Sequence, residues 1–493
     1  MTLLLLAVLL PLVGGAVLPL FRFQQERPRS LYVEAVVLVT SALTWWAICL
    51  SPEGELPLLR MTDTLTLTLH LDGMSKVFAG LVSFLWPLAS LYGFEYMRHE
   101  NRPNAFFAYY TMSYGVTLAV ALAGNLFSLY VFYECLTMVT LPLVTHKKDV
   151  QSIRAGRKYL IFSISGAALA FIALIFIMHY GVSTDFVLGG VLDMSKVAGH
   201  EVVLRLVFLL AFIGFGTKAA VFPMYAWLPA ASVAPTPVTA LLHAVAVVNA
   251  GAYAVIRVIY YSFGAKFLYG SVAQIIAVCL ACFTILFGST MAVREQHFKR
   301  RLAYSTVSNL SYMLMGAALM TPGGGGMVGS LSHLIFHGLM KIGLFYCAGA
   351  VLVQTGKEYV QDLRGMGRVM PFTFTCFTIG SIAMVGIPPL CGFVSKWNLL
   401  TAAADTGSWW GIVSIATLII SAILTAVYLF TVVSVAWFRP LDASDAALAG
   451  KNTDPGWQMK LPLALLCVMV VLCGVFSTPL VQWLRSVAAG LVL

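Results

Sequence analysis

Two lysines lie deep inside apolar segments of this chain, close to prolines. Lys218 is in GFGTKAAVFPMYAWLP, and Lys396 is in GIPPLCGFVSKWNLL. An ammonium group in the hydrocarbon core of a membrane costs roughly 3 kcal/mol on insertion scales, and such groups usually mark ion pathways. A proline in a membrane helix frees backbone carbonyl groups, which neighbouring helices or a water-lined cavity must satisfy. Both segments therefore predict interrupted helices that carry an ion-transfer site.

The carboxylate of Glu134 lies in a third apolar segment, LYVFYECLTMVTLP, which follows Asn125. At about 1.5 Å per helical residue, Glu134 is expected near the middle of a membrane span. A nearby lysine would keep this carboxylate ionised, and Lys218 is the natural partner. Two interpretations remain. The pair is either a static contact that fixes helix packing, or a switch in which the protonation of Lys218 and its distance from Glu134 change together.

His333, His337 and Lys341 are spaced at i, i+4 and i+8 in another apolar segment. Residues at this spacing share one face of a helix. A neutral imidazole donates from one nitrogen and accepts at the other, and its ordinary pKa of ~6.5 makes both protonation states accessible. We interpret the stripe as a proton relay. A structural role and a metal site are the alternatives, although the stripe offers no carboxylate or thiolate as a further ligand.

Three more residues are assigned to this path or to its ends. His243 and Asn249 lie in PTPVTALLHAVAVVNAGAY and are expected to line a hydrated route between Lys218 and the histidine stripe. A purely structural role fits His243 equally well. Lys299, in QHFKRRLAYST, is either an entry or exit group for protons or a positive anchor at the cytoplasmic surface.

The sequence carries no motif for catalysis or for a bound cofactor. Cys279 and Cys282 form one CxxC, but no second pair or nearby histidine completes a zinc or iron–sulfur site. The segment TPGGGGM at residues 321–327 is not followed by the GK[ST] of a phosphate loop, and no dinucleotide fingerprint or nucleophile triad occurs. We therefore assign no enzyme chemistry and no cofactor to this chain itself.

The segments that must position these residues are membrane spans. Hydrophobic residues make up 60% of the chain and charged residues 10%, a balance typical of a polytopic membrane protein. Apolar stretches of sufficient length predict an all-α protein with about fourteen spans. They begin near Leu3, Leu31, Val77, Phe106, Phe127, Tyr159, Leu206, Val238, Val272, Leu302, Leu331, Phe372, Ile412 and Leu461.

The basic residues predict how these spans are oriented. Most Lys and Arg residues fall in alternate connections, which is the pattern of cytoplasmic loops if the N-terminus is outside. The net charge of +10 then reflects topology, and no nucleic-acid partner is needed to explain it. The first segment, MTLLLLAVLLPLVGGAVLPLF, lacks a basic n-region. It is predicted to be a retained span and not a cleaved signal peptide.

Two connections are expected to have structure of their own. Polar and apolar residues alternate from Thr62 to Leu71, which predicts a short hairpin on the outer side. The polar stretch from Phe438 to Lys460 is the longest one on the cytoplasmic side. Both an amphipathic helix on the membrane surface and an irregular loop fit this stretch.

Four stretches together resemble the antiporter-like subunit family shared by respiratory complex I, the Mrp multisubunit cation/proton antiporters and the membrane-bound energy-converting hydrogenases. They are PMYAWLPAASVAPTPVTALLHAVAVVNAGAY, KRRLAYSTVSNLSYM, SHLIFHGLMKIGLFY and GIPPLCGFVSKW. The resemblance implies about fourteen helices with both termini outside, two inverted five-helix repeats, and broken helices at the seventh and twelfth spans. The implied divisions are 1–104 (helices 1–3 with the hairpin), 105–262 (first repeat, helices 4–8), 270–438 (second repeat, helices 9–13) and 439–493 (cytoplasmic loop and helix 14).

The resemblance also implies a shared role for the buried ionisable residues. The residues that match the family's glutamate, its partner lysine, the central relay and the terminal lysine are Glu134, Lys218, His333, His337, Lys341 and Lys396. Many relatives have a lysine where this chain has Asn249. The link between the two half-channels is therefore expected to depend on water, His243 and Asn249.

The implied function is proton translocation by one subunit of a multisubunit complex in the cytoplasmic membrane of a prokaryote, with Na⁺ coupling left open. Expected partners are other antiporter-like and small hydrophobic subunits and lipids, with peripheral redox subunits if the complex is redox-driven. Iron–sulfur, flavin or nickel–iron centres would then belong to those partners. Lys396, where some complex I relatives use glutamate, favours an Mrp-type or hydrogenase-type complex. A membrane scaffold without transport and a stand-alone ion-coupled solute transporter are the alternatives.

Overall fold

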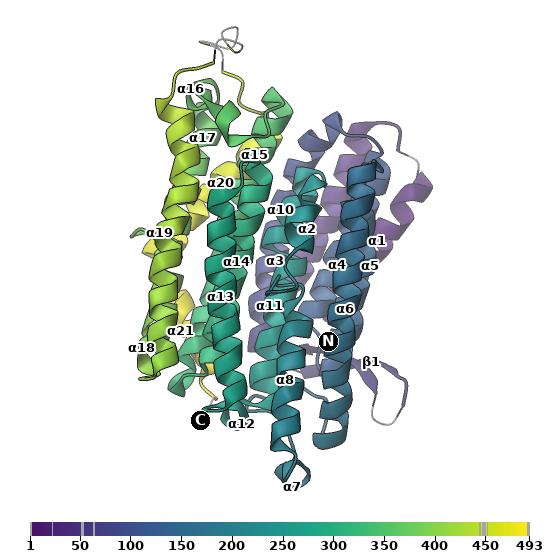
Figure 1. Ribbon diagram of the computed structural model, residues 1–493. Coiled ribbons are helices and arrows are strands. Elements are labelled where there is room, and N and C mark those ends of the chain that lie inside the picture. Colours follow the sequence, from purple (N-terminus) through teal and green to yellow (C-terminus); the bar gives the residue numbers. More distant parts are fainter. Residues whose placement is uncertain are drawn as a thin grey trace.

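The computed structural model describes residues 2–21, 23–50, 54–62, 65–442, 445, 450 and 452–490. These residues form a bundle of long helices that run side by side (Figure 1). Within them, ten helices are long and apolar enough to cross a membrane. This is fewer than the predicted number of about fourteen spans. One reason is that some crossings are divided into shorter helices, such as α8, with 16 residues, and α17 and α18, with 15 each.

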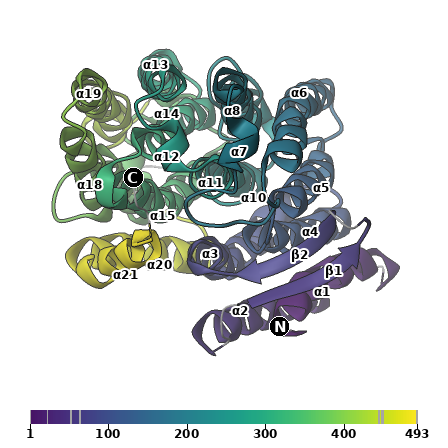
Figure 2. The same ribbon diagram turned by 90° about the horizontal axis from the view of Figure 1, so that it is seen from below.

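The N-terminal part forms a layer on one side of the bundle. α1 (Thr2–Val17) packs on α2 (Glu26–Leu50), and α2 packs on α3 (Gly73–Tyr96). Seen along the bundle, α1 and α2 lie outside α3 and α4 (Figure 2).

The connection between α2 and α3 contains a β-hairpin, as predicted. β1 (Gly54–Arg60) pairs antiparallel with β2 (Thr66–Leu71). The hairpin therefore begins earlier than the predicted start at Thr62. Residues 63 and 64 of the predicted segment lie outside the described residues.

Two groups of helices follow, and each contains a crossing that is interrupted at a buried lysine. The first group comprises α4 (Pro103–Ala121), α5 (Leu126–Val144), α6 (Val150–Tyr180), α8 (Glu201–Gly216), α9 (Trp227–Ala230), α10 (Thr236–Ala244) and α11 (Val247–Arg257). The second comprises α13 (Val272–Arg294), α14 (Phe298–Leu319), α15 (Gly325–Thr355), α17 (Pro371–Val385), α18 (Cys391–Asp405) and α19 (Trp409–Phe438). The remaining helices are α7 (Met194–Val197), α12 (Ala265–Leu268), α16 (Met366–Val369), α20 (Trp457–Val475) and α21 (Thr478–Ala488).

The two predicted interruptions are present. Helix α8 ends before Lys218, residues 217–226 are not helical, and the chain becomes helical again in α9. Residues 386–390 separate α17 from α18, which carries Lys396. Glycines allow close approach at both places. A Cβ at Gly251 would lie 2.4 Å from the backbone nitrogen of Ala219, and one at Gly392 would lie 1.8 Å from the carbonyl oxygen of Ala383.

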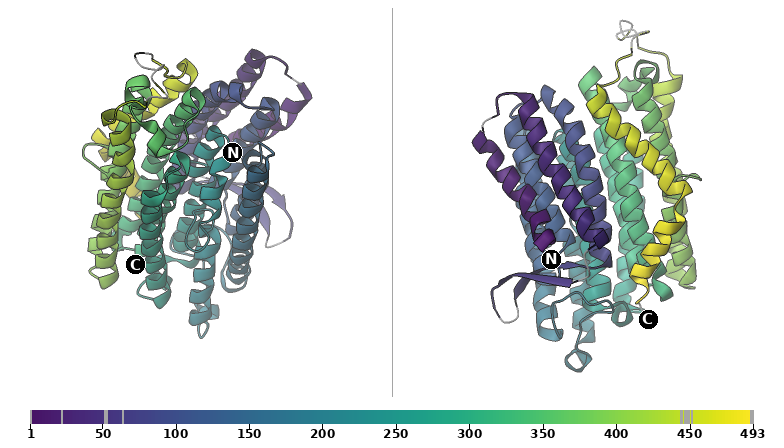
Figure 3. Two further views of the ribbon diagram at one scale, coloured as in Figure 1. Left: turned by 45° about the horizontal axis from the view of Figure 1, so that its top comes forward. Right: turned by 180° about the vertical axis from the view of Figure 1, so that it is seen from behind.

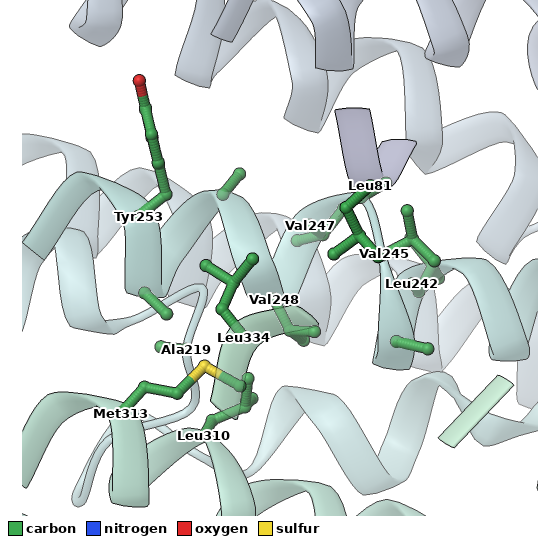
Figure 4. Packing of buried hydrophobic residues seen from close by; sticks show 14 of the residues in the cluster. Leu81, Ala219, Leu242, Val245, Val247, Val248, Tyr253, Leu310, Met313 and Leu334 are labelled. Carbon is green, nitrogen blue, oxygen red and sulfur yellow. The ribbon is translucent and has the colours of Figure 1, made fainter. Parts of the chain in front are cut away.

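A third interruption separates α10 from α11 at residues 245 and 246. No proline or glycine marks these two positions, so the sequence did not predict it. Figure 4 shows Val245 and Val247 packed near Leu81 at this place, and Val248 near Leu334. These apolar contacts hold the interruption inside the bundle.

The two ends of the bundle differ in charge. The hairpin, α7 and α12 lie at one end, and α16 lies at the other (Figure 1). Both marked chain ends lie toward the hairpin end (Figure 3). The connections at the α16 end carry many basic residues, including Arg98, Arg102, Lys147, Lys148, Arg300, Lys357 and Arg364. This asymmetry agrees with the alternation of charge along the sequence.

Some predicted features of the α16 end fall on residues that are not described. Arg22 and Lys451, which the sequence predicts to lie in cytoplasmic connections, are outside the described residues. So do residues 443, 444 and 446–449 of the Phe438–Lys460 connection. The choice between an amphipathic helix and an irregular loop there stays a prediction.

A buried ion pair joins α3 to α11 at the hairpin end. The Arg257 guanidinium donates to both carboxylate oxygens of Asp72, at 2.5 and 2.6 Å. Asp72 is also the N-cap of α3 and accepts from the backbone N–H of Ser75. Burial by itself would raise the pKa of Asp72, but the charge and hydrogen bonds of Arg257 and the contacts with Ser75 outweigh it and lower that pKa. The sequence analysis did not predict this pair, because Asp72 and Arg257 lie 185 residues apart.

We expect Arg257→Met to destabilise the protein strongly. It leaves a buried carboxylate without its partner, which typically costs roughly 3–5 kcal/mol. The measurement is thermal unfolding of the detergent-solubilised protein. The control is Arg364→Met, which breaks the exposed contact between Arg364 and Asp442 at 3.7 Å and should cost no more than about 1 kcal/mol. Similar shifts for the two variants would contradict a stabilising role for the buried pair.

Candidate functional site

Lys218 and Glu134 meet inside the bundle as predicted. The Lys218 Nζ atom lies 3.9 Å from Oε1 of Glu134. The lysine side chain is 1% exposed and the glutamate side chain 21% exposed. At this distance the two groups form an ion pair without a direct hydrogen bond. Oε1 of Glu134 has no hydrogen-bond partner among the described residues.

The helix that carries Glu134 also holds the Lys218 ammonium. Lys218 donates to the backbone carbonyl oxygen of Tyr133, and its Nζ lies 3.5 Å from the centroid of the Tyr133 ring. The Tyr133 hydroxyl in turn donates to the carbonyl oxygen of Phe215 at 2.6 Å. Phe215 is in the last turn of α8, so α5 contacts the interrupted crossing both at the end of α8 and at Lys218.

The three residues of the predicted stripe lie on α15 and are fully buried. The rings of His333 and His337 are stacked with their centroids 5.9 Å apart. Lys341 donates to the Ser305 hydroxyl of α14 at 2.6 Å. Both ring nitrogens of His337 and Nε2 of His333 have no hydrogen-bond partner among the described residues. Buried polar atoms of this kind commonly bind internal water.

The stripe continues to Lys396 through α18. Nδ1 of His333 is hydrogen-bonded to the hydroxyl of Ser395, at 2.9 Å, and Ser395 precedes Lys396 in the chain. The Lys396 ammonium donates to the carbonyl oxygens of Met384 and Val385, at 2.8 and 3.0 Å. Both carbonyls belong to the last turn of α17. Lys396 therefore occupies the C-terminal end of the interrupted helix, where the helix dipole favours a cation.

His243 and Asn249 lie on the two sides of the α10–α11 interruption. The Asn249 amide donates to the carbonyl oxygen of Ala244 at 2.9 Å, which is across the break. His243 packs on the Phe345 ring with centroids 5.0 Å apart, and within the described chain neither of its ring nitrogens has a hydrogen-bond partner. It lies within electrostatic reach of Lys341. No hydrogen bond among the described residues joins either side chain to Lys218.

Lys299 is buried, unlike an ordinary surface anchor. It is 5% exposed and donates to the carbonyl oxygen of Ala234 at 3.2 Å. The charges that act on it include those of Glu100 and Lys147. These two residues line a polar cavity of about 460 Å³ together with His146.

Residues 123–425 match the family described as NADH:quinone oxidoreductase/Mrp antiporter, TM. The chain belongs to this family. The chain is 33% identical over 436 residues to NADH-quinone oxidoreductase subunit N of Desulforudis audaxviator, with 84% of this chain and 83% of that protein covered. It is 29% identical over 507 residues to Na⁺/H⁺ antiporter subunit A1 of Staphylococcus haemolyticus, covering 98% of this chain but only 62% of that longer protein.

Solved structures of family complexes show the same fold. The structure of the Mrp complex from a Dietzia species contains a chain that matches with a TM-score of 0.85 and 25% identity, covering 99% of this chain and 52% of that chain. The archaeal membrane-bound sulfane sulfur reductase contains a chain that matches with a TM-score of 0.83 and 21% identity. The match covers 99% of this chain and 98% of that chain. The resemblance stated from the sequence is confirmed. The protein is an antiporter-like membrane subunit of the kind found in Mrp and complex I-type complexes.

A network of hydroxyl groups adjoins Lys341 and Lys396 and was not predicted. The Ser305 hydroxyl, which accepts from Lys341, is also hydrogen-bonded to the hydroxyl of Tyr428 at 2.7 Å. Further along α14, Tyr312 donates to Ser421 at 2.8 Å, and its ring lies 5.4 Å from the Lys396 ammonium. Ser305 and Tyr312 are seven residues apart, so they share a face of α14. The run of hydroxyl and amide side chains between Ser305 and Tyr312 was the available signal in the sequence.

We expect Lys218→Ala to change the protonation of Glu134. The substitution removes the positive charge 3.9 Å from Oε1, and an unpaired carboxylate in an apolar environment tends to take up a proton. Infrared spectroscopy should then show a protonated carboxyl band at neutral pH that disappears in Lys218→Ala/Glu134→Gln. Lys396→Ala is the control and should not produce the band. An ionised Glu134 in Lys218→Ala would contradict the pairing.

Proposed function

We propose that this chain translocates protons as one subunit of a multisubunit membrane complex. The observation that carries the proposal is the set of buried lysines and the acceptors that hold each of them. One lysine, Lys218, has a carboxylate partner, whereas Lys341 and Lys396 are held by neutral oxygens of the described residues. Charges buried in this way are costly in a membrane and are typical of proton pathways. Na⁺ coupling is an open extension of the same proposal.

The Glu134–Lys218 pair is proposed to act as the switch. At 3.9 Å and an effective dielectric constant of ~20, the Coulomb attraction is about 4 kcal/mol. Opening the pair would remove that attraction and favour release of the Lys218 proton. The interrupted segment at 217–226 gives the lysine backbone room to move that an uninterrupted helix would not allow.

The α15 stripe is proposed to carry the proton onward. A proton from the cytoplasmic side would load Lys341, pass through His337 and His333, and leave through Lys396. The stacked rings and the His333 contact to Ser395 support this order. Lys299 and the polar cavity at Glu100 and Lys147 are proposed as an entrance.

Water is proposed to complete the link between Lys218 and α15. His243 lies on the path and has ring nitrogens without a partner in the described chain. The Asn249 side-chain oxygen is likewise unpartnered there. Internal water bound to these atoms would join the interrupted α8–α9 crossing to the histidine stripe.

The finer architecture belongs to the same proposal. We propose that the chain crosses the cytoplasmic membrane about fourteen times, with two inverted repeats at 105–262 and 270–438 and both ends outside. The basic residues at the α16 end support this orientation. Its partners would be other antiporter-like and small hydrophobic subunits, as in the multisubunit complexes that contain its relatives.

Transport assays should separate this function from a scaffold role. Lys218→Ala and Glu134→Ala should each lower proton transport by the reconstituted complex at least about tenfold, which corresponds to about 1.4 kcal/mol. Assembly of the complex should not change. Lys196→Ala, on exposed α7, is the control and should transport normally. A variant that loses assembly but transports in proportion to the complex formed would support the scaffold.

The partners should reveal the type of complex. We expect the chain to co-purify from native membranes in mild detergent with small hydrophobic antiporter-like subunits, and mass spectrometry would identify them. Such subunits alone would indicate an Mrp-type exchanger. Iron–sulfur, nickel–iron or NADH-oxidising subunits would indicate a redox-driven pump. Purification as an isolated chain would contradict the multisubunit proposal and favour a stand-alone transporter.

A further inference from the structure

Two cavities lie on the outside of the bundle between α2 and α20, and we call the surface that contains both cavities the groove. Each of these helices packs on α3, and they lie on either side of it (Figure 2). At the α16 end the groove holds a cavity of about 470 Å³ lined by α2, α3 and the start of α20. Toward the hairpin end it holds a second cavity of about 530 Å³, which is also lined by α15 and α21. The first cavity is lined by α2 between residues 26 and 34 and the second by Trp45 and Ile48, so residues 35–44 of α2 separate them.

The carboxylate of Glu34 faces the first cavity and takes no part in the proposed proton path. The Ser90 hydroxyl of α3 donates to it at 2.6 Å. Among the described residues, no basic side chain forms an ion pair with it. Glu34 is eight residues beyond Glu26, where α2 begins, so it lies about 12 Å along the helix. This depth is within the apolar part of a span.

Apart from Lys76 of α3, the residues that line the cavity toward the hairpin end are apolar side chains and a glycine. Trp45, Phe84 and Met469 line the cavity toward the hairpin end. At the other end, the contact between Arg98 and Glu26 at 2.7 Å forms a charged rim. Acyl chains can cover the apolar walls, but they cannot pair with a carboxylate at the depth of Glu34. A helix of about 10 Å diameter can do both.

We propose that a transmembrane helix of another subunit occupies this groove and places a Lys or Arg side chain against Glu34. The helix covers Leu31 near the charged rim and Trp45 near the hairpin end. The complementary charge fixes its depth and its rotation, because only one face of the partner helix meets the carboxylate. This contact is independent of the proposed proton path, since none of its residues belongs to that path.

Crosslinking in the assembled complex tests the occupant. The photoreactive residue p-benzoylphenylalanine replaces Leu31 in one variant and Trp45 in another. Val39, which is 50% exposed on the same helix but lines neither cavity, is the control position. The expected result is one and the same partner chain at Leu31 and Trp45, with crosslinked peptides in an apolar helix that contains a Lys or Arg at the depth of Glu34. Phospholipid adducts at both positions, or two different partner chains, would overturn the proposal.

Substitution of the carboxylate tests the charge complementarity. Glu34→Leu should lower recovery of the crosslinked subunit at least about tenfold, and Glu34→Gln, which keeps the shape, should lower it less. Glu34→Lys combined with glutamate at the basic position of the partner should restore recovery. Glu26→Gln removes only the rim contact and should leave recovery unchanged. Unchanged recovery in Glu34→Leu would overturn the pairing. These outcomes do not depend on transport, so they stand apart from failure of the proposed function.

Discussion

The contact between the Lys218 ammonium and the Glu134 carboxylate is the constraint on which the rest of the buried site depends. A charged lysine in a membrane needs hydrogen-bond acceptors or a counter-charge from neighbouring segments. Residues 217–226 leave the helix and place the ammonium against α5, where both the Tyr133 carbonyl and Glu134 are available. The absence of a side chain at Gly251 lets α11 pack directly against this irregular backbone.

In the second interrupted crossing, the buried lysine is also held by acceptors at the interruption, but these acceptors are backbone carbonyls and not a carboxylate. Lys396 has no carboxylate partner in the described chain, and it donates to two carbonyls that the end of α17 leaves free. The negative end of the helix dipole adds to this stabilisation. A neutral carbonyl oxygen attracts an ammonium less strongly than a carboxylate does, so the two buried lysines differ in the kind of acceptor that holds them.

Residue type and spacing predicted much of this arrangement. Prolines near Lys218 and Lys396 marked both interruptions, and the i, i+4, i+8 spacing placed His333, His337 and Lys341 on one face. What the sequence did not predict depends on contacts between distant segments. Nothing near Arg257 in the sequence indicates an ion pair, because its partner Asp72 is 185 residues away in the chain. The break between α10 and α11 has no local signal, since packing and the Asn249 amide stabilise it.

The break between α10 and α11 gives the neutral side chain of Asn249 a structural role between the two groups of helices. The Asn249 amide is committed to the carbonyl of Ala244 across the break, so this side chain holds the backbone open and carries no charge. His243, on the other side of the break, keeps both ring nitrogens free of protein partners within the described chain and lies within reach of the Lys341 charge. A histidine can both accept and donate a proton, whereas an amide side chain does not titrate. In the proposed proton path, the transfer step at the junction is therefore assigned to His243, and the role assigned to Asn249 is to hold the break open.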